Sequence, residues 1–234
     1  MSEFSTQMQM NYFTSLHMSH AIINCWLQGA GNNLPPTSTT FSNHSGTRPT
    51  HPPLPRHLIF TTSFLALFSF AGYTTYSPAK AALRSLSDTL SQEMNLYSAA
   101  NPDEPKVRLH TLFPAGILSE GYQAEMQIKS DLTKMLETGD QPETPDYIAS
   151  RCLKGLESGQ ELITSDWKTD LVKRSMLGGS VRGGFVRGMG DWLLASLMVI
   201  VMAIVRRDMD NQVRSWGRQF GATGMKGDKA PAKN

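Results

Sequence analysis

The stretch HLIFTTSFLALFSFAGYTTYSPAKAALRSLSDTLSQEM, residues 57–94, places a strand pattern directly before a helix pattern. Its first part, HLIFTT (His57–Thr62), is a short apolar run rich in β-forming residues, which predicts a buried parallel strand. The part that begins at Tyr76 predicts a helix that runs to about Tyr97. The apolar face of this helix is made of Leu83, Leu86, Leu90 and Met94. A buried strand followed by an amphipathic helix is the first half of a βαβ unit.

The chain after this stretch repeats the alternation. VRLHTLF (Val107–Phe113) predicts a second strand, and ELIT (Glu161–Thr164) predicts a brief third one. Between them, Thr144-Pro145-Asp146 predicts the start of a helix that runs to about Glu157, because it joins an N-cap, a first-turn proline and an early acid. We therefore predict an α/β fold with a parallel sheet and covering helices.

The composition of the chain limits the classes of partner and site that we expect. The 234 residues are enough for one domain with its own core, and a formal charge of +2 gives no reason to expect nucleic acid as a partner. The two cysteines, Cys25 and Cys152, lie far apart without the spacing of metal ligands, which indicates a reducing compartment, or at least no disulfide framework, and no metal site. Met1–Met10 is polar, so we expect no secretory signal.

One long apolar run, WLLASLMVIVMAIV (Trp192–Val205), lies near the C-terminal end. Fourteen helical residues span about 21 Å, short of the roughly 30 Å hydrocarbon layer of a bilayer. The run is either a buried core helix or a membrane-associated one, lying in one leaflet or crossing as a short span. Arginines flank it on both sides, which favours the membrane.

Tyr76 and Lys80 stand four residues apart, so a helix places them on one face, one turn apart. An ammonium near a phenol lowers the phenol pKa from about 10, which would make Tyr76 a usable proton donor. The alternative is an ordinary surface pair. Context favours the first interpretation, because Ser63 at the end of one predicted strand and Pro114-Ala115-Gly116-Ile117 after the next share the ligand-binding edge of the sheet.

The combination resembles the catalytic block of the short-chain dehydrogenases/reductases. In that family a serine ends a strand and a Y-x-x-x-K opens the following helix thirteen residues later, as Ser63, Tyr76 and Lys80 do here. VRLHTLFPAGI resembles the next strand and its turn. MQMNYFTSLHMSHAII resembles the preceding helix, in which Asn11 falls on the catalytic asparagine. Thr14 departs from the family pattern, which has a glycine there.

This resemblance implies a mechanism and a cofactor. Tyr76 would protonate the substrate alkoxide, Lys80 would lower the tyrosine pKa and bind the nicotinamide ribose, Ser63 would hold the carbonyl oxygen, and Asn11 would keep a proton-relaying water. Pro114, Gly116 and Ile117 would line the nicotinamide pocket. The cofactor implied is NADPH. Many members pair through the helix of the tyrosine, so a homo-oligomer is possible.

Within the family, AGYTTYSPAKAALRSLSDTLSQE and FPAGILSEGYQAE resemble the 3-ketodihydrosphingosine reductases of sphingolipid synthesis, particularly fungal ones. This implies a long-chain keto-amine lipid as substrate and an endoplasmic reticulum membrane, with the catalytic part facing the cytosol. Residues 118–137 would close over the lipid chain. The alternatives are another membrane-bound member, such as a hydroxysteroid dehydrogenase, and a non-catalytic membrane-bound interaction protein that retains the scaffold.

The resemblance also divides the chain. We predict a helix with the asparagine motif (1–28), a disordered Pro/Thr-rich insert (29–55), the catalytic part of a Rossmann-like domain (56–176), an apolar and basic membrane-associated segment (177–220) and a disordered tail (221–234).

The glycine-rich phosphate loop and ribose selector of the family find no match in this sequence, and about half of a doubly wound sheet is missing. We expect an incomplete gene product in preference to a genuine short form, an unpaired apolar sheet edge, and weak or no activity of the polypeptide alone.

Overall fold

A computed structural model describes residues 2–28, 54–176, 184–221 and 224–226. Its centre is a parallel sheet of β1 (Arg56–Thr61), β2 (Val107–Phe113) and β3 (Leu162–Thr164), in the order β1-β2-β3. The predicted α/β class with a parallel sheet is therefore confirmed. Within the described ranges β1 pairs only with β2, and its Ile59 side chain is 43% exposed, as expected for an unpaired edge.

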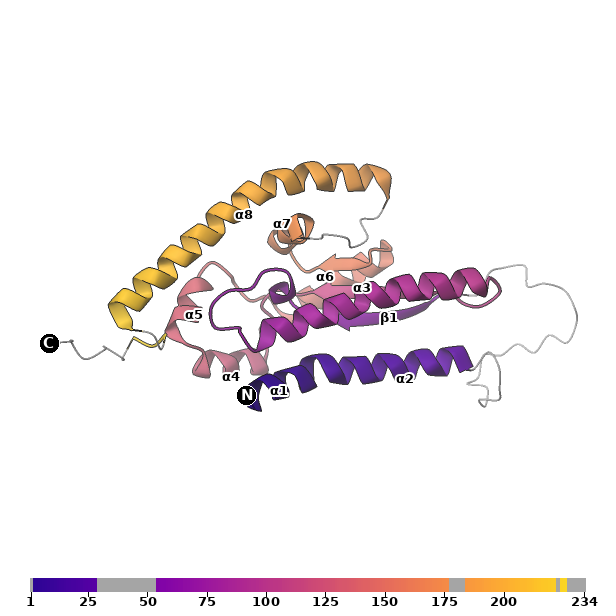
Figure 1. Ribbon diagram of the computed structural model, residues 1–234, viewed down its shortest axis with the longest axis horizontal. Helices are drawn as coiled ribbons and strands as arrows, with labels where there is room; N and C mark the ends of the chain where they lie inside the picture. Colours follow the sequence, from indigo (N-terminus) through magenta and orange to yellow (C-terminus); the bar gives the residue numbers. More distant parts are fainter. Residues whose placement is uncertain (1, 29–53, 177–183, 222–223, 227–234) are drawn as a thin grey trace, which may run out of the picture.

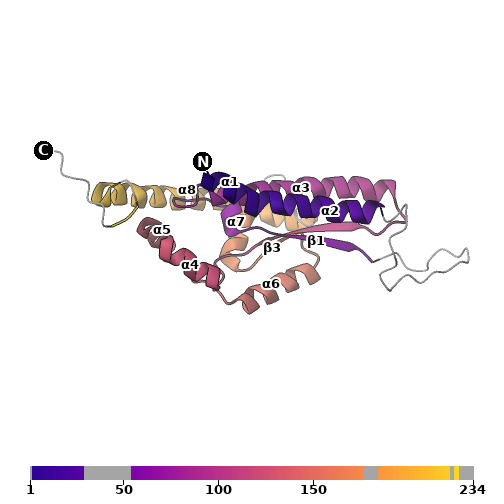
Figure 2. The same cartoon turned by 90° about the horizontal axis from the view of Figure 1, so that it is seen from below.

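Helices cover both faces of the sheet (Figures 1 and 2). Two of them, α2 and α3, run side by side along one face, while α6 lies on the other. The helices are α1 (Ser2–Met8), α2 (Thr14–Gln28), α3 (Tyr76–Ala100), α4 (Glu120–Ile128), α5 (Asp131–Leu136), α6 (Pro145–Glu157), α7 (Trp167–Met176) and α8 (Phe185–Phe220). A π-helical turn, Gln9–Phe13, joins α1 to α2, and a 3-10 turn, Phe64–Ala66, follows β1.

Most predicted elements are present at nearly the predicted bounds. Helix α6 spans the predicted residues, with the Thr144 hydroxyl accepting from the Tyr147 amide at its start. The helix predicted for residues 1–28 is present as α1, the π-helical turn and α2, whereas α7 was not predicted. The apolar run at Trp192–Val205 is only the middle of the much longer α8. The predicted insert, apart from residues 54–55, and most of the predicted tail lie outside the described residues.

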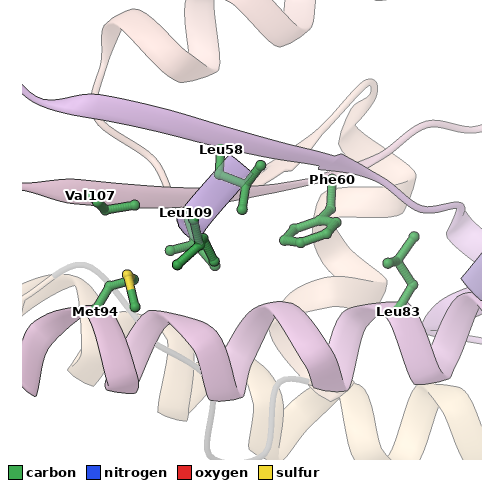
Figure 3. Close-up of a cluster of buried hydrophobic side chains, with 7 residues drawn as sticks. Leu58, Phe60, Leu83, Met94, Val107 and Leu109 are labelled. Carbon is green, nitrogen blue, oxygen red and sulfur yellow. The ribbon is translucent and has the colours of Figure 1, made fainter. Parts of the chain in front are cut away.

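The main core lies between α3 and the sheet (Figure 3). The alternation of β1 and β2 turns Leu58, Phe60, Val107 and Leu109 toward α3. On the helix, Leu83 and Met94 pack against these strand residues, and both belong to the four residues predicted for its apolar face. This packing fixes the start of α3, and thus Tyr76, against the ends of the strands.

Leu83→Ala tests this core. Leu83 is only 1% exposed, so its truncation leaves a cavity, and we expect the free energy of unfolding to fall by about 2–5 kcal/mol. Urea denaturation followed by circular dichroism measures the change. The control, Leu96→Ala on the same helix, removes a side chain that is 74% exposed, and it should change the free energy by less than about 0.5 kcal/mol. Equal losses in the two variants would contradict the packing.

Candidate active site

A cavity of about 740 Å³ opens at the carboxyl ends of the three strands. Ser63 and Phe64 reach it after β1, Ala115 and Gly116 after β2, and Asp166 after β3. The start of α3 and the helices α4 and α5 complete its walls. The cavity lies where parallel α/β sheets bind their ligands.

Ser63 and Tyr76 both line this cavity, as predicted. Ser63 has an extended backbone, and its hydroxyl accepts a hydrogen bond from the Leu65 amide at 3.2 Å. Burial raises the pKa of the Tyr76 phenol, while a hydrogen bond with Ser63 acts in the opposite direction. The predicted lowering of the Tyr76 pKa is not found in the protein alone, because burial outweighs the hydrogen bond with Ser63, and the role of Lys80 in lowering this pKa stays a prediction.

Lys80 lies one helical turn beyond Tyr76, on the same face. Its ammonium is 5.5 Å from the centre of the Tyr76 ring and donates to the Thr61 carbonyl at 3.3 Å. Burial lowers the pKa of Lys80. The lysine therefore joins α3 to the end of β1 and stands behind the tyrosine, although it is not among the residues that line the cavity.

Asn11, like Lys80, is not among the residues that line the cavity. It lies in the π-helical turn, where its amide donates to the Gln7 side chain at 2.7 Å and to the Gln7 carbonyl at 3.2 Å. Gln7 itself lines the cavity, so Asn11 approaches the site only through this neighbour. Single π-helical turns within α-helices are frequent at functional sites.

The residues of the turn after β2 have two different roles. Gly116 lines the cavity, as predicted for a residue of the nicotinamide pocket. The Pro114 carbonyl accepts from the Phe64 amide at 2.9 Å and so holds the two strand ends together. Ile117 packs against the core cluster of Ile148 and Ile163. Of the described cavity lining, Pro114 and Ile117 form no part, so they position the turn.

A hydrogen-bonded network in the cavity wall was not predicted. The Lys129 ammonium is paired with Glu125 at 3.0 Å and with Glu137 at 2.7 Å. The Tyr73 hydroxyl donates to Glu125 at 3.1 Å and also to Glu137. Burial opposes the charge of Lys129, but the hydrogen bonds to the two glutamates outweigh it and raise its pKa. Burial and Glu137 raise the pKa of Tyr73 far above its ordinary value.

The cavity carries an excess of negative charge. Five carboxylates and two ammonium groups line it: Glu3, Glu125, Glu137, Asp140, Asp166, Lys129 and Lys168. Burial, together with the nearby Asp166, raises the pKa of Asp140. A cavity with such an excess attracts a cationic ligand more strongly than a neutral one.

Gly72 docks the loop before Tyr76 onto α5. It has a φ of +102°, and an added Cβ would stand 2.0 Å from the Thr133 hydroxyl oxygen. Gly72→Ala combines a strained backbone with a clash, so we expect the free energy of unfolding to fall by about 2–4 kcal/mol. Thermal and urea unfolding measure the loss. Gly121→Ala, whose Cβ would meet only a contact at 3.8 Å, should be neutral or slightly stabilising, and a similar loss in both would contradict the docking.

Comparison with known proteins gives a consistent set of relatives. A 3-ketodihydrosphingosine reductase of Aspergillus fumigatus is 39% identical over 224 residues, which is 92% of this chain and 56% of the relative. One of Neurospora crassa is 38% identical, over 92% of this chain and 52% of the relative. One of Cryptococcus neoformans is also 38% identical, over 68% and 44% respectively. This chain spans about half the length of the curated relatives that it matches. No family model and no solved structure matches the sequence.

Proposed function

Since this chain is a homologue of the fungal 3-ketodihydrosphingosine reductases, we propose that it carries the catalytic part of an NADPH-dependent 3-ketodihydrosphingosine reductase of sphingolipid biosynthesis. The observation that carries the proposal is the position of Ser63 and Tyr76. Both residues line one cavity at the carboxyl ends of parallel strands, and the Lys80 ammonium lies 5.5 Å from the centre of the Tyr76 ring.

The residues present fit the nicotinamide end of such a cofactor, because Gly116, which has no side chain, lines the cavity together with the two hydroxyl residues Ser63 and Tyr76. Tyr76, Lys80 and Gly116 would hold that end, with Pro114, Ile117 and Asn11 supporting it from behind. When bound, the reduced nicotinamide supplies the hydride for the ketone carbon.

Two side chains then act on the ketone oxygen. The Ser63 hydroxyl donates a hydrogen bond to this oxygen, on which negative charge develops during the reaction. The Tyr76 phenol donates the proton that converts the developing alkoxide to the alcohol. The raised pKa of Tyr76 suits the reduction of the ketone, since the phenol is protonated at neutral pH and can act as an acid. Lys80, behind the ring, stabilises the phenolate that remains.

The cavity suits a long-chain keto-amine. The excess of carboxylates matches the ammonium group next to the ketone, and it favours this substrate over a neutral steroid. Apolar side chains continue the same cavity and suit an alkyl chain: Phe68, Phe70, Ile128, Leu136 and Met209. Ile128 lies in α4, Leu136 in α5 and Met209 in α8. The segment 118–137, which contains the first two, would therefore cover part of the bound alkyl chain.

The helix α8 supports a membrane location. Its segment Gly188–Phe220 is long and apolar enough to cross a membrane, and only 11% of its most apolar window is buried. The resemblance to the reductases extends the proposal to the endoplasmic reticulum, with the site facing the cytosol. The free thiols of Cys25 and Cys152 agree with that reducing compartment. Pairing of two copies through α3 stays a prediction.

A chimera tests the proposal. The matched half of the Aspergillus fumigatus reductase is replaced by this chain, and the purified chimera is assayed for NADPH oxidation with 3-ketodihydrosphingosine. We expect product to form at a rate within about tenfold of the parent enzyme, because the catalytic groups are all supplied by this chain. A folded chimera that binds both ligands but forms no dihydrosphingosine would contradict the function.

Glu125→Gln in the same chimera tests the recognition of the amine. Glu125 lines the cavity, and a charge-assisted hydrogen bond is worth about 1.5–3 kcal/mol, so we expect KM for the amino ketone to rise by roughly 10- to 100-fold. The matched control is a long-chain ketone without the amino group, for which KM should stay unchanged. Equal effects on both ketones would show that Glu125 acts only through Lys129 and the fold.

A further inference from the structure

The long C-terminal helix α8 is attached to the rest of the protein near its start, in its middle and just past its end. Its 36 residues correspond to about 54 Å, far more than a bilayer crossing needs. Figure 1 shows that it arcs over α7 and ends beside α5. This path raises the question of how the helix meets a membrane, because a crossing and an in-plane position have different requirements.

Three contacts hold α8 against the rest of the protein. Near its start, the Asp191 carboxylate is paired with Arg174 of α7 at 2.6 Å, and only 8% of the Asp191 side chain is exposed. In its middle, Arg206 donates to the Ser69 carbonyl at 3.4 Å. Just past its end, the Leu132 amide of α5 donates to the Gly224 carbonyl at 3.0 Å. A helix held in this way lies along the protein surface.

The inner face of α8 is built for this contact. Asp191, Met198 and Trp216 are buried, and they are spaced to fall on one side of the helix. Crossing a bilayer would require this side to leave the protein and enter lipid. The Asp191 charge would then lose Arg174, and an unpaired charge in hydrocarbon is strongly unfavourable.

The outer face of α8 changes character along its length. Its first part exposes large apolar side chains: Phe185, Val186, Met189, Trp192, Leu193, Leu197, Ile200 and Ile204. On the same side, the last part exposes arginines: Arg207, Arg214 and Arg218. An apolar face that continues into a basic one fits the boundary between acyl chains and anionic headgroups.

We propose that α8 lies in the plane of the membrane, embedded by its outer face in one leaflet of anionic lipid, and does not cross the bilayer. This proposal rests on the membrane association proposed above and adds its geometry. A second hollow of about 420 Å³ lies beneath the helix, with Arg206, Met209 and Val213 in its wall. It shares Phe70, Tyr73, Leu136 and Met209 with the candidate active site. An in-plane α8 would therefore place the opening of the site at the lipid surface.

Site-specific cysteine labelling of the purified chain tests the geometry. In a Cys25→Ser background, in which the remaining Cys152 is buried, Leu193→Cys, Ile200→Cys and Arg207→Cys each receive a fluorescent label, and the chain is bound to preformed vesicles of phosphatidylcholine with 30% phosphatidylserine. These three positions are all exposed on the outer face, so the core is not disturbed. Nitroxide lipids report the depth of each label, and externally added dithionite reports its side. Leu153→Cys on α6, which is 57% exposed, is the control that should stay in water.

We expect all three labels to lie at one shallow depth and to be reduced completely by external dithionite. A crossing would separate the labels at 193 and 207 by about 21 Å in depth and would protect one end from dithionite, which would overturn the in-plane position alone. A chain that does not bind vesicles, whether it stays single or pairs through α8, would overturn both this inference and the proposed membrane association.

The arginines allow an independent measurement. Each basic residue near an anionic surface contributes about fivefold to binding, so Arg207→Gln, Arg214→Gln and Arg218→Gln together should weaken partitioning into anionic vesicles by on the order of 100-fold. Binding to neutral vesicles should stay unchanged. Lys154→Gln, an exposed position on α6, is the matched control and should have no effect. A triple variant that binds both vesicle types like the wild type would overturn the role of the basic face.

Discussion

Tyr76→Phe should lower kcat/KM of the chimera by about 10²- to 10⁴-fold, the range that general acid catalysis contributes. The substitution removes only the hydroxyl, so the ring packing against Tyr73 and Lys80 is kept. Binding of the ketone should change little, because Ser63 still faces the cavity. The loss should therefore fall on kcat, and steady-state kinetics with 3-ketodihydrosphingosine separates kcat from KM.

Tyr147→Phe is the matched control, since that tyrosine is 46% exposed on α6 and lies outside the lining of the cavity. It should leave kcat/KM unchanged. Thermal unfolding of both variants shows whether either one fails to fold. Full retention of dihydrosphingosine formation by folded Tyr76→Phe would favour the alternative of a non-catalytic interaction protein.

The sequence was sufficient for those parts of the fold that local patterns decide. Helix α6 has its start signal in three consecutive residues, Thr144-Pro145-Asp146, and the structure begins the helix there. The two apolar strands and the apolar face of α3 depend on spacings of two and of three to four residues, which are visible in any sequence. Tyr76 and Lys80 lie on one face for the same reason.

Other features depend on contacts that are distant in sequence. Glu125 and Lys129 form an i,i+4 pair that the sequence does display, but Tyr73 and Glu137 join them from other segments. The raised pKa of Tyr76 depends on burial, which the pattern of the chain alone does not give. The full length of α8 was missed because its polar last part breaks the apolar run, although buried Trp216 continues its inner face.

Lys129→Met should lower the free energy of unfolding by about 1–3 kcal/mol, because it removes a buried cation that bonds to two partly exposed carboxylates. Lys129 is 9% exposed and bonds to both Glu125 and Glu137, which also share the Tyr73 hydroxyl. The methionine keeps the packing of the stem, so the loss reports the charge. Urea unfolding at pH 7 measures it, and Lys154→Met on the exposed face of α6 should change the value by less than about 0.5 kcal/mol.

The pH dependence separates this cause from a packing defect. In the wild type the pKa of Lys129 is raised in the folded state, so its contribution is fully present below the unfolded pKa of about 10.4 and is lost as the pH rises through the higher folded value. The stability difference between the wild type and Lys129→Met should therefore shrink as the pH rises above about 10.4, because only the wild type carries this lysine. A difference that stays constant as the pH rises through that range would show that the methionine disturbs the packing, and that the charge of Lys129 is not what holds α4 and α5 against the tyrosines.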